Sequence, residues 1–407
     1  MIRLRRNKIM AGALDGVKIL GFTHFAQGPF ALQLLGDLGA EIINIERQGS
    51  GDFNRHFQNL DSLNGEGVFF LAMNRNKRSM SLNLKAPEAK AIIERLIKES
   101  DVVMTNYRAG ALDRLGFGFD YCKTLNPKIV FCEALGYGRT GPYAALPGQD
   151  LLAQALSGLT TMIGPDVDGR PVAGGIYEVD VYGSLMLVIG MLSALHYAKE
   201  TGIGQRVAVD LLSSGIHMQS QELAYYLNSG IVPQRPHNHS GHVLQASPYG
   251  VYRTANGWMV LSTNAGDNPK QLGEIIGEPN MELLMPDNEA KMTRRDELHT
   301  VIESRLVKHD TEYWLEKMRA VGIWCAKVNS YEDLPNDPQV VHNGIIKEID
   351  HPVAGKFKAI GTPIEFSETP PTIRRTPPAL GEHNDEILNE LGFSDEEIAA
   401  FHAANIF

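Results

Sequence analysis

Two aspartates precede apolar helical segments in this sequence and could carry nucleophilic chemistry. Asp150 opens the predicted helix in 146–158, and Asp180 lies just before the uncharged segment 185–198. A carboxylate at a helix N-terminus can attack an activated acyl group. The N-terminus lowers the carboxylate pKa and offers backbone N–H donors to a developing oxyanion. The alternative interpretation is structural, because aspartate is also a preferred N-cap residue.

Other nucleophile and nucleotide motifs do not compete with these aspartates. The sequence has no G-x-S-x-G, no cysteine elbow and no Walker loop. Glu46 ends a predicted strand, where dinucleotide-binding folds place a ribose-binding acid. The turn 22–30, FTHFAQGPF, has one glycine and a proline where a G-x-G-x-x-G turn should be. A pyrophosphate could not approach this backbone in the usual way, which argues against a nicotinamide or flavin.

Two polar clusters allow further alternatives. The histidines of HNHSGH (237–242) have a spacing that could hold a metal, but no acid or cysteine lies close in sequence. We therefore expect a solvated or substrate-side loop and no metal site. Arg75, Lys77 and Arg78 precede a predicted strand. These cations form either a solvated face or a site for a small polyanion such as a nucleotide phosphate.

The elements that must position these residues alternate between strands and helices. This order predicts an α/β fold with a large, Rossmann-like, doubly wound parallel sheet. Strands are expected at 17–20, 41–46, 79–84, 101–106, 128–135 and 205–212, with helices at 28–40, 87–100 and 185–198.

A change of composition predicts a second, smaller α+β domain. Residues 229–248 are rich in Pro, Gly, Ser, His and Asn, as in a linker. Residues 249–263 predict a hairpin around an Asn-Gly turn. Helices are expected at 268–276, 295–308 and 311–321, followed by a Pro-rich passage (335–380) and two final helices.

Composition limits the function classes. The 407 residues carry a formal net charge of −10, which makes a phosphate-backbone partner unsuited as the main ligand. Three widely spaced cysteines give no disulfide framework and fit a reducing compartment. The basic N-terminal residues precede no apolar signal segment, and 185–198 is too short to span a bilayer. We expect a cytoplasmic protein.

Several motifs in a fixed order make the chain resemble the family III CoA-transferases, which include formyl-CoA transferases and carnitine-related CoA-transferases. The resemblance runs from Leu14 to the C-terminus. Its motifs are GFTHFAQGPFALQLLGDLGAEIINIERQGSGD (21–52), NRNKRSMSLNLK (74–85), ALDRLGFGFDYCKTLNP (111–127), GYGRTGPYAALPGQDLLAQALSG (136–158), YEVDVYGSLMLVIGMLSALHYAKETGIGQRVAVDLL (177–212) and PPALGEHNDEILNELG (377–392).

The resemblance implies catalytic roles. Asp180 corresponds to the nucleophilic aspartate, which forms a mixed anhydride with the donor acyl group and then an aspartyl-CoA thioester. Asp150 corresponds to an active-site acid that orients or polarises reacting groups, and His24 to a histidine at the first βα turn. Gln27 is displaced by one residue from the family's glutamine, so its role stays open. The capping and catalytic interpretations of Asp180 are compatible.

The resemblance also implies the substrates. An acyl-CoA and a small carboxylic acid, with dicarboxylates such as succinate, mesaconate or malate among the candidates, are the expected partners. Coenzyme A is a substrate here, and no permanently bound cofactor, metal, nucleic acid or membrane is expected. Lys77 and Arg78 are expected to assist nearby. The expected CoA-binding residues are Arg47, Leu82, Lys85, Asn106, Tyr107 and Arg114.

At the level of the whole chain, the resemblance implies an interlocked homodimer. A large CoA-binding domain would comprise residues 10–215 and 345–407, and a small α+β domain residues 236–330. Two linkers, 216–235 and 331–344, would leave a hole for the partner chain.

Alternatives within the fold remain at this stage. An α-methylacyl-CoA racemase would need a histidine before Asp150 for proton exchange, but Gln149 occupies that position. CoA transfer within one dicarboxylate molecule, and an acyl-CoA-binding module without catalysis, are further alternatives. The family's glycine-rich flap is replaced here by HSGHVLQASPYG (239–250), so formyl and oxalate are doubtful substrates.

Overall fold

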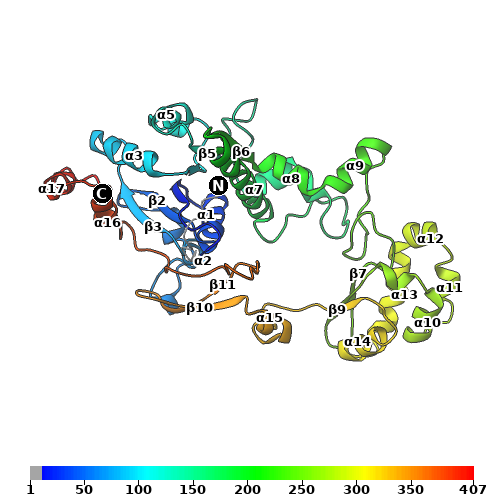
Figure 1. Ribbon diagram of the computed structural model, residues 1–407. Helices are drawn as coiled ribbons and strands as arrows, with labels where there is room; N and C mark the ends of the chain where they lie inside the picture. Colours follow the sequence, from blue (N-terminus) through cyan, green and yellow to red (C-terminus); the bar gives the residue numbers. More distant parts are fainter. Residues whose placement is uncertain (1–11) are drawn as a thin grey trace, which may run out of the picture. The chain divides into compact units, whose positions relative to one another are not determined.

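A six-stranded sheet, all of whose strand pairs are parallel, organises the N-terminal half of the molecule (Figure 1). The computed structural model describes residues 12–407. The strand order is β3-β2-β1-β4-β5-β6, which is the doubly wound arrangement, and it confirms the predicted α/β class. The strands are β1 (Lys18–Phe22), β2 (Glu41–Arg47), β3 (Arg78–Leu82), β4 (Val102–Thr105), β5 (Val130–Leu135) and β6 (Arg206–Asp210).

Helices cover both faces of this sheet, so most side chains of its central strands are buried and apolar. Side chains of β1 alternate between two cores. Ile19 packs with α1 (Gln27–Asp37) and α7 (Glu178–Thr201), whereas Leu20 and Phe22 pack on the other side with α3 (Pro87–Glu99), α16 (Asn384–Glu390) and α17 (Asp395–Ala403). The helices of this part are α1 (Gln27–Asp37), α2 (Val68–Met73), α3 (Pro87–Glu99), α4 (Ala111–Arg114), α5 (Phe119–Leu125), α7 (Glu178–Thr201), α8 (Leu211–Met218), α15 (Pro338–Asn343), α16 (Asn384–Glu390) and α17 (Asp395–Ala403).

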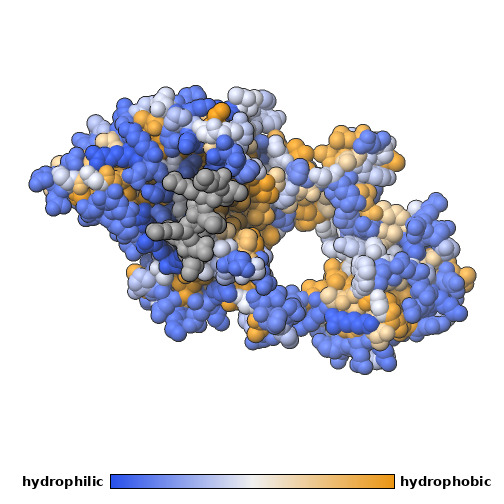
Figure 2. All heavy atoms as spheres, in the orientation of Figure 1, coloured by the Kyte–Doolittle hydropathy of each residue, from blue (hydrophilic) through white to orange (hydrophobic). Residues whose placement is uncertain are grey.

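Helix α7 is longer than the sequence predicted. Its 24 residues give it the length and composition of a membrane-crossing helix, whereas the apolar run 185–198 is only part of it. Buried helices in the cores of proteins can have the same length and composition. One face of α7, including Leu187 and Met191, is buried against the sheet. Leu185 and Ile189 are exposed, and Figure 2 shows hydrophobic surface over this helix.

The second part of the chain has its own small core. The predicted hairpin is present: β7 (Gly250–Arg253) pairs antiparallel with β8 (Trp258–Leu261) across an Asn-Gly turn. A third strand, β9 (Cys325–Lys327), joins β8 and was not predicted. The helices are α6 (Asp150–Leu156), which leads into this part, α9 (Ser220–Ser229), α10 (Pro269–Ile276), α11 (Met281–Leu284), α12 (Asn288–Thr293), α13 (Arg295–Leu306) and α14 (Thr311–Arg319).

The Pro-rich passage 335–380 contains an antiparallel hairpin that sequence reasoning missed. Strand β10 (Ile346–His351) pairs with β11 (Gly355–Ile360). Only alternate residues of the pair are buried, among them Ile349 and Phe357, so the apolar signal is weak.

The chain separates into two compact units. One consists of residues up to Ala153, Tyr177–Gly215 and Pro338–Phe407, and the other of Gln154–Ile176 and Ile216–Asp337. The second unit takes in residues 154–176, whereas the sequence predicted 10–215 as one continuous part. The other predicted domain and linker boundaries stay a prediction.

Candidate active site

A cavity of about 500 Å³ lies at the carboxyl ends of β1, β4 and β5. The loops that follow these strands line it together with the start of α7. Strand order reverses between β1 and β4, and ligands of open α/β sheets bind at this switch point. Its volume is in the range of small-molecule sites. The described site residues that line it are His24, Gln27, Asn106, Tyr107, Arg108, Gln149 and Asp180.

Asp180 occupies the first turn of α7 and faces this cavity. Burial, and then the negative charge of Asp150, raise its pKa from 3.8 to about 7. The sequence predicted that the helix N-terminus would lower the pKa of this carboxylate. Desolvation outweighs the helix dipole here, because little water reaches the side chain. Near neutral pH, Asp180 is therefore divided between its neutral and ionised forms.

Asp150 caps the helix on which Asp180 lies. Its Oδ1 atom accepts hydrogen bonds from the backbone N–H groups of Val179 (2.8 Å) and Asp180 (2.9 Å). The N-cap residue of α7 is Tyr177, and no side chain of that residue caps the helix. The structural interpretation of Asp180 as an N-cap was therefore wrong. The backbone N–H groups of Val179 and Asp180 already donate to Asp150, so they are not available to an oxyanion.

The loop after β1 presents His24 to the cavity. The His24 N–H donates to Asn106 Oδ1 (3.0 Å), and Asn106 Nδ2 donates to the His24 carbonyl (2.6 Å). The imidazole lies 5.4 Å from the Tyr107 ring, centroid to centroid. Burial lowers the His24 pKa, which favours the neutral ring. A neutral histidine can donate or accept one hydrogen bond per nitrogen.

The next residue, Phe25, has a left-handed backbone with φ of 61°. Such a conformation is unfavourable for a bulky side chain and needs support from its surroundings. Asp52 Oδ1 accepts from the Phe25 N–H (3.3 Å), and Asn54 Nδ2 donates to the Phe25 carbonyl (2.7 Å). These bonds hold the turn that presents His24 and Gln27.

Gln27 is a site residue whose role the sequence left open. It is the first residue of α1, is 5% exposed, and lines the cavity with Asp180. Its Nε2 atom is buried and has no hydrogen-bond partner among the described residues. It lies against Gly183, where a Cβ atom would approach Nε2 to 2.6 Å. A buried amide donor without a partner is suited to a ligand oxygen.

A second cavity, of about 430 Å³, adjoins the first, because His24 and Tyr107 line both. Arg47 and His56 also line it. Of the predicted CoA-binding residues, the structure thus brings Arg47, Asn106 and Tyr107 to these two cavities. Leu82 is 1% exposed, pairs in register with Arg47 and lines neither cavity. Lys85 and Arg114 are exposed and line neither cavity.

Glu46 does not act as a ribose-binding acid. Its carboxylate accepts two hydrogen bonds from Arg55 (2.7 and 2.8 Å) and one from the Ser79 hydroxyl (2.6 Å). These bonds leave little room for a ribose hydroxyl, consistent with the missing glycine-rich turn.

The cations of 74–79 have partners inside the protein, so the segment is neither of the two alternatives left open by the sequence, a solvated face or an anion site. Arg75 pairs with Asp37 (2.6 Å), and both side chains are buried. Lys77 is 1% exposed and donates to two backbone carbonyls and to Asn74. Arg78 pairs with Glu386 and Glu390. Because burial demands internal partners for charged groups, none of these cations is free for a phosphate.

The histidines of 237–242 have separate partners. His239 stacks on His299, and His242 Nε2 lies 2.7 Å from Glu222. Among the described residues, no group of three or more His, Cys, Asp or Glu side chains is arranged to hold a metal.

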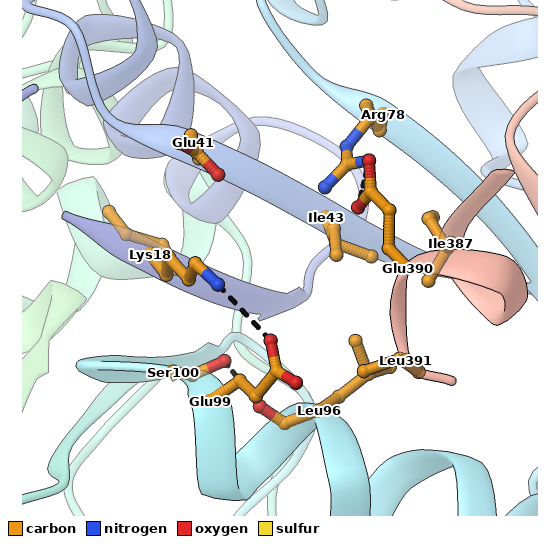
Figure 3. Close-up of a pocket in the computed structure, with 11 residues that line it drawn as sticks. Lys18, Glu41, Ile43, Arg78, Leu96, Glu99, Ser100, Ile387, Glu390 and Leu391 are labelled. Carbon is orange, nitrogen blue, oxygen red and sulfur yellow. Dashed lines mark hydrogen bonds and ion pairs between the residues drawn. The ribbon is translucent and has the colours of Figure 1, made fainter. Parts of the chain in front are cut away.

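Another hollow, at the amino ends of β1–β3, is too small for a substrate (Figure 3). Its volume is about 50 Å³, and ion pairs fill its walls: Lys18 with Glu99, and Arg78 with Glu390. It lies at the edge of the sheet opposite the Asp180 cavity.

Comparisons with known proteins agree with this geometry. The strand order defines a doubly wound α/β fold, and the sequence profile of CoA-transferase family III matches residues 14–384. The chain therefore belongs to CoA-transferase family III, and it is a CoA-transferase, as the resemblance predicted.

Individual relatives and a solved structure match over nearly the whole chain. Succinyl-CoA:glutarate CoA-transferase from Mus musculus is 34% identical and covers 94% of this chain and 87% of its own. Formyl-CoA:oxalate CoA-transferase from Streptomyces coelicolor is 32% identical, with 97% and 99% covered. The crystal structure of a CAIB/BAIF family protein from Brucella suis has a TM-score of 0.80 at 28% identity, with 94% and 100% covered.

Proposed function

We propose that this enzyme moves CoA from an acyl-CoA donor to a small dicarboxylic acid through covalent intermediates on Asp180. The observation that supports this proposal most strongly is the position of Asp180, whose buried carboxylate lines the first cavity. The second cavity, which contains Arg47, adjoins the first. The names of the relatives, which specify glutarate and oxalate, support dicarboxylic acids as substrates.

The proposed reaction has two symmetrical halves. An Asp180 oxygen attacks the donor thioester carbonyl, the C–S bond breaks, and a mixed anhydride and CoA thiolate form. The thiolate attacks the Asp180 carbonyl, which gives aspartyl-CoA and releases the donor acid as a carboxylate. The acceptor carboxylate attacks aspartyl-CoA, and the thiolate then takes the acyl group from the new anhydride. Asp180 ends as a carboxylate, and no net proton or redox change occurs.

The proposed intermediates demand a cavity that excludes water, because anhydrides and thioesters hydrolyse. Apolar side chains form much of the lining, including Phe69, Leu135, Leu146 and Leu211. The unpaired Gln27 amide would donate to the oxygen that becomes negative when a carbonyl is attacked. Neutral His24 would donate a second hydrogen bond, and Asp150 would hold the start of α7 in place.

For coenzyme binding, we place the nucleotide end of CoA at the second cavity and the thioester at the first. The Arg47 guanidinium suits a phosphate, and Tyr107, which lines both cavities, offers an aromatic face. The exposed cations Lys85 and Arg114 would then reach phosphates from outside the cavities. A racemase is less well supported, because Gln149 lines the Asp180 cavity and cannot shuttle a proton.

We further propose that the active form is an interlocked homodimer. Support comes from apolar side chains left exposed on helices of each unit: Leu185 and Ile189 on α7, and Tyr226 and Leu227 on α9. Large exposed apolar patches typically mark protein interfaces. All three cysteines are free thiols, which suits the proposed cytoplasmic location.

Replacement of the nucleophile tests this function. Asp180→Asn should lower CoA exchange between succinyl-CoA and glutarate by about 10³-fold or more, while CoA affinity measured by calorimetry stays nearly unchanged. Glu178→Gln is the matched control, because Glu178 is an acid in the same helical turn. Undiminished exchange by the Asp180 variant would contradict the proposal.

A further inference from the structure

We propose that Arg108 selects dicarboxylic acids by binding the distal carboxylate of the substrate whose other carboxylate reacts at Asp180. The inference rests on the proposed function and specifies how the same cavity recognises its acid. Arg108 lies in the loop between β4 and α4 and lines the Asp180 cavity.

The charges of the cavity wall single out this residue. Among the described residues that line the Asp180 cavity, Asp180 is the one acid and Arg108 the one lysine or arginine. The remaining lining is apolar, glycine or neutral polar. A dicarboxylate with one carboxylate at Asp180 therefore meets one permanent cation in this cavity for its other end.

The Arg108 guanidinium is available for a ligand. It makes no hydrogen bond or ion pair with any described residue. Two other arginines of the same unit differ: Arg139 is paired with Glu133, and Arg55 with Glu46. An arginine that is already paired would have to exchange its partner for the substrate, whereas Arg108 needs no such exchange.

The backbone around Arg108 is fixed although its side chain is free. Asn106 makes two reciprocal hydrogen bonds with His24, so the loop is tied to the loop after β1. The Tyr107 N–H donates to the Thr105 hydroxyl (3.1 Å), and the Arg108 carbonyl accepts from Ala111 (2.9 Å). Because the backbone is already ordered, less conformational entropy is lost when the guanidinium binds a carboxylate.

The chemistry of recognition follows from these features. A guanidinium and a carboxylate form two parallel hydrogen bonds, which a methyl group at the same place cannot make. Sites that hydrogen-bond a substrate group discriminate strongly against analogues lacking it. Arg108 would thus favour a dicarboxylate over a monocarboxylate of equal length. Binding of a CoA phosphate by the same guanidinium is the competing outcome of the test.

The experiment compares glutarate with pentanoate, which has a methyl group in place of the distal carboxylate. In a double-displacement reaction, kcat/KM for the acceptor reports the second half-reaction alone. Arg108→Gln should lower kcat/KM for glutarate by about 10- to 100-fold and leave that for pentanoate within about twofold. Arg108→Lys should keep part of the glutarate rate. Lys98→Gln, which removes an exposed cation at the end of α3, is the charge control.

A substrate-side change supplies an independent readout without a variant. Replacing one glutarate carboxylate by a carboxamide should slow the wild-type enzyme and have little further effect on Arg108→Gln. Equal losses for glutarate and pentanoate, or weaker CoA binding by the variant, would overturn the proposal and assign Arg108 to the coenzyme. Failure of the proposed function would look different, because the wild type itself would then form no covalent intermediate at Asp180.

Discussion

At the residue scale, the environment of Asp180 sets its reactivity. Desolvation raises the free energy of its ionised form, and the charge of Asp150 acts in the same direction. Asp150 is held in place because its carboxylate bonds the N–H groups of Val179 and Asp180. The same contact therefore positions the nucleophile and raises its pKa.

This arrangement predicts the pH dependence. The reactive form is the carboxylate, so kcat/KM for the acyl-CoA donor should rise with pH, with an inflection near 7, and level off above about pH 8. Asp150→Asn keeps an oxygen that can accept the two N–H bonds but removes the charge. Its inflection should move to lower pH, by on the order of one unit.

Initial rates from pH 5 to 9 check this prediction, with Asp150→Ala as the variant that also loses the cap. An Asp150→Asn enzyme that is inactive at every pH, although folded, would show instead that Asp150 exchanges a proton with substrate.

At the element scale, the pattern of apolar residues predicted the positions of the strands of the large sheet. The six strands of the parallel sheet are short segments rich in apolar residues that alternate with helical segments, so their positions could be predicted to within a few residues. Strands β9, β10 and β11 were missed because they are short or only half buried.

Spatial relations were less predictable than elements. The run 74–79 has the composition of an anion site, and only the fold shows that Arg75 meets Asp37 and that Lys77 meets backbone carbonyls. Likewise, sequence spacing cannot show that Asp150 caps the helix of Asp180, because Asp150 and Val179 are 29 positions apart in the sequence. The unpaired Gln27 amide has no sequence signal beyond its place at the start of α1.

The close approach of α1 and α7 yields a prediction at this scale. A Cβ atom on Gly183 would lie 2.6 Å from Gln27 Nε2, so Gly183→Ala must displace this amide. We expect kcat to fall by about 10-fold or more if Gln27 stabilises a developing oxyanion.

Gly190→Ala is the matched control. It adds the same methyl group to the same helix, with a Cβ atom 2.7 Å from Val207 on β6, away from the cavity. Thermal unfolding should show similar destabilisation of both variants, and steady-state kinetics should show a loss of kcat for Gly183→Ala alone. Equal kinetic losses would refute a specific role for Gln27.

At the scale of the whole molecule, exposed apolar side chains point to self-association. Leu185 and Ile189 are 43% and 56% exposed on α7, while the opposite face of this helix is buried in the core. Leaving such side chains in water would be unfavourable, and covering them is the usual source of dimer stability.

The proposed dimer should have twice the chain mass in light scattering and should not dissociate on dilution to nanomolar concentration. Because an interlocked dimer couples folding to association, its unfolding midpoint should rise with protein concentration. Ile189→Glu should abolish the dimer, whereas Lys199→Glu, on an exposed position in the last turn of α7, should not. A monomer with full activity would contradict this part of the account.

The most direct measurement asks whether substrate carbon becomes bonded to Asp180. The enzyme is incubated with succinyl-CoA, quenched with hydroxylamine, digested and examined by mass spectrometry. We predict a hydroxamate on the peptide that contains Asp180, dependent on succinyl-CoA and absent from Asp180→Asn. An unmodified Asp180 peptide from enzyme that is exchanging CoA would contradict the account.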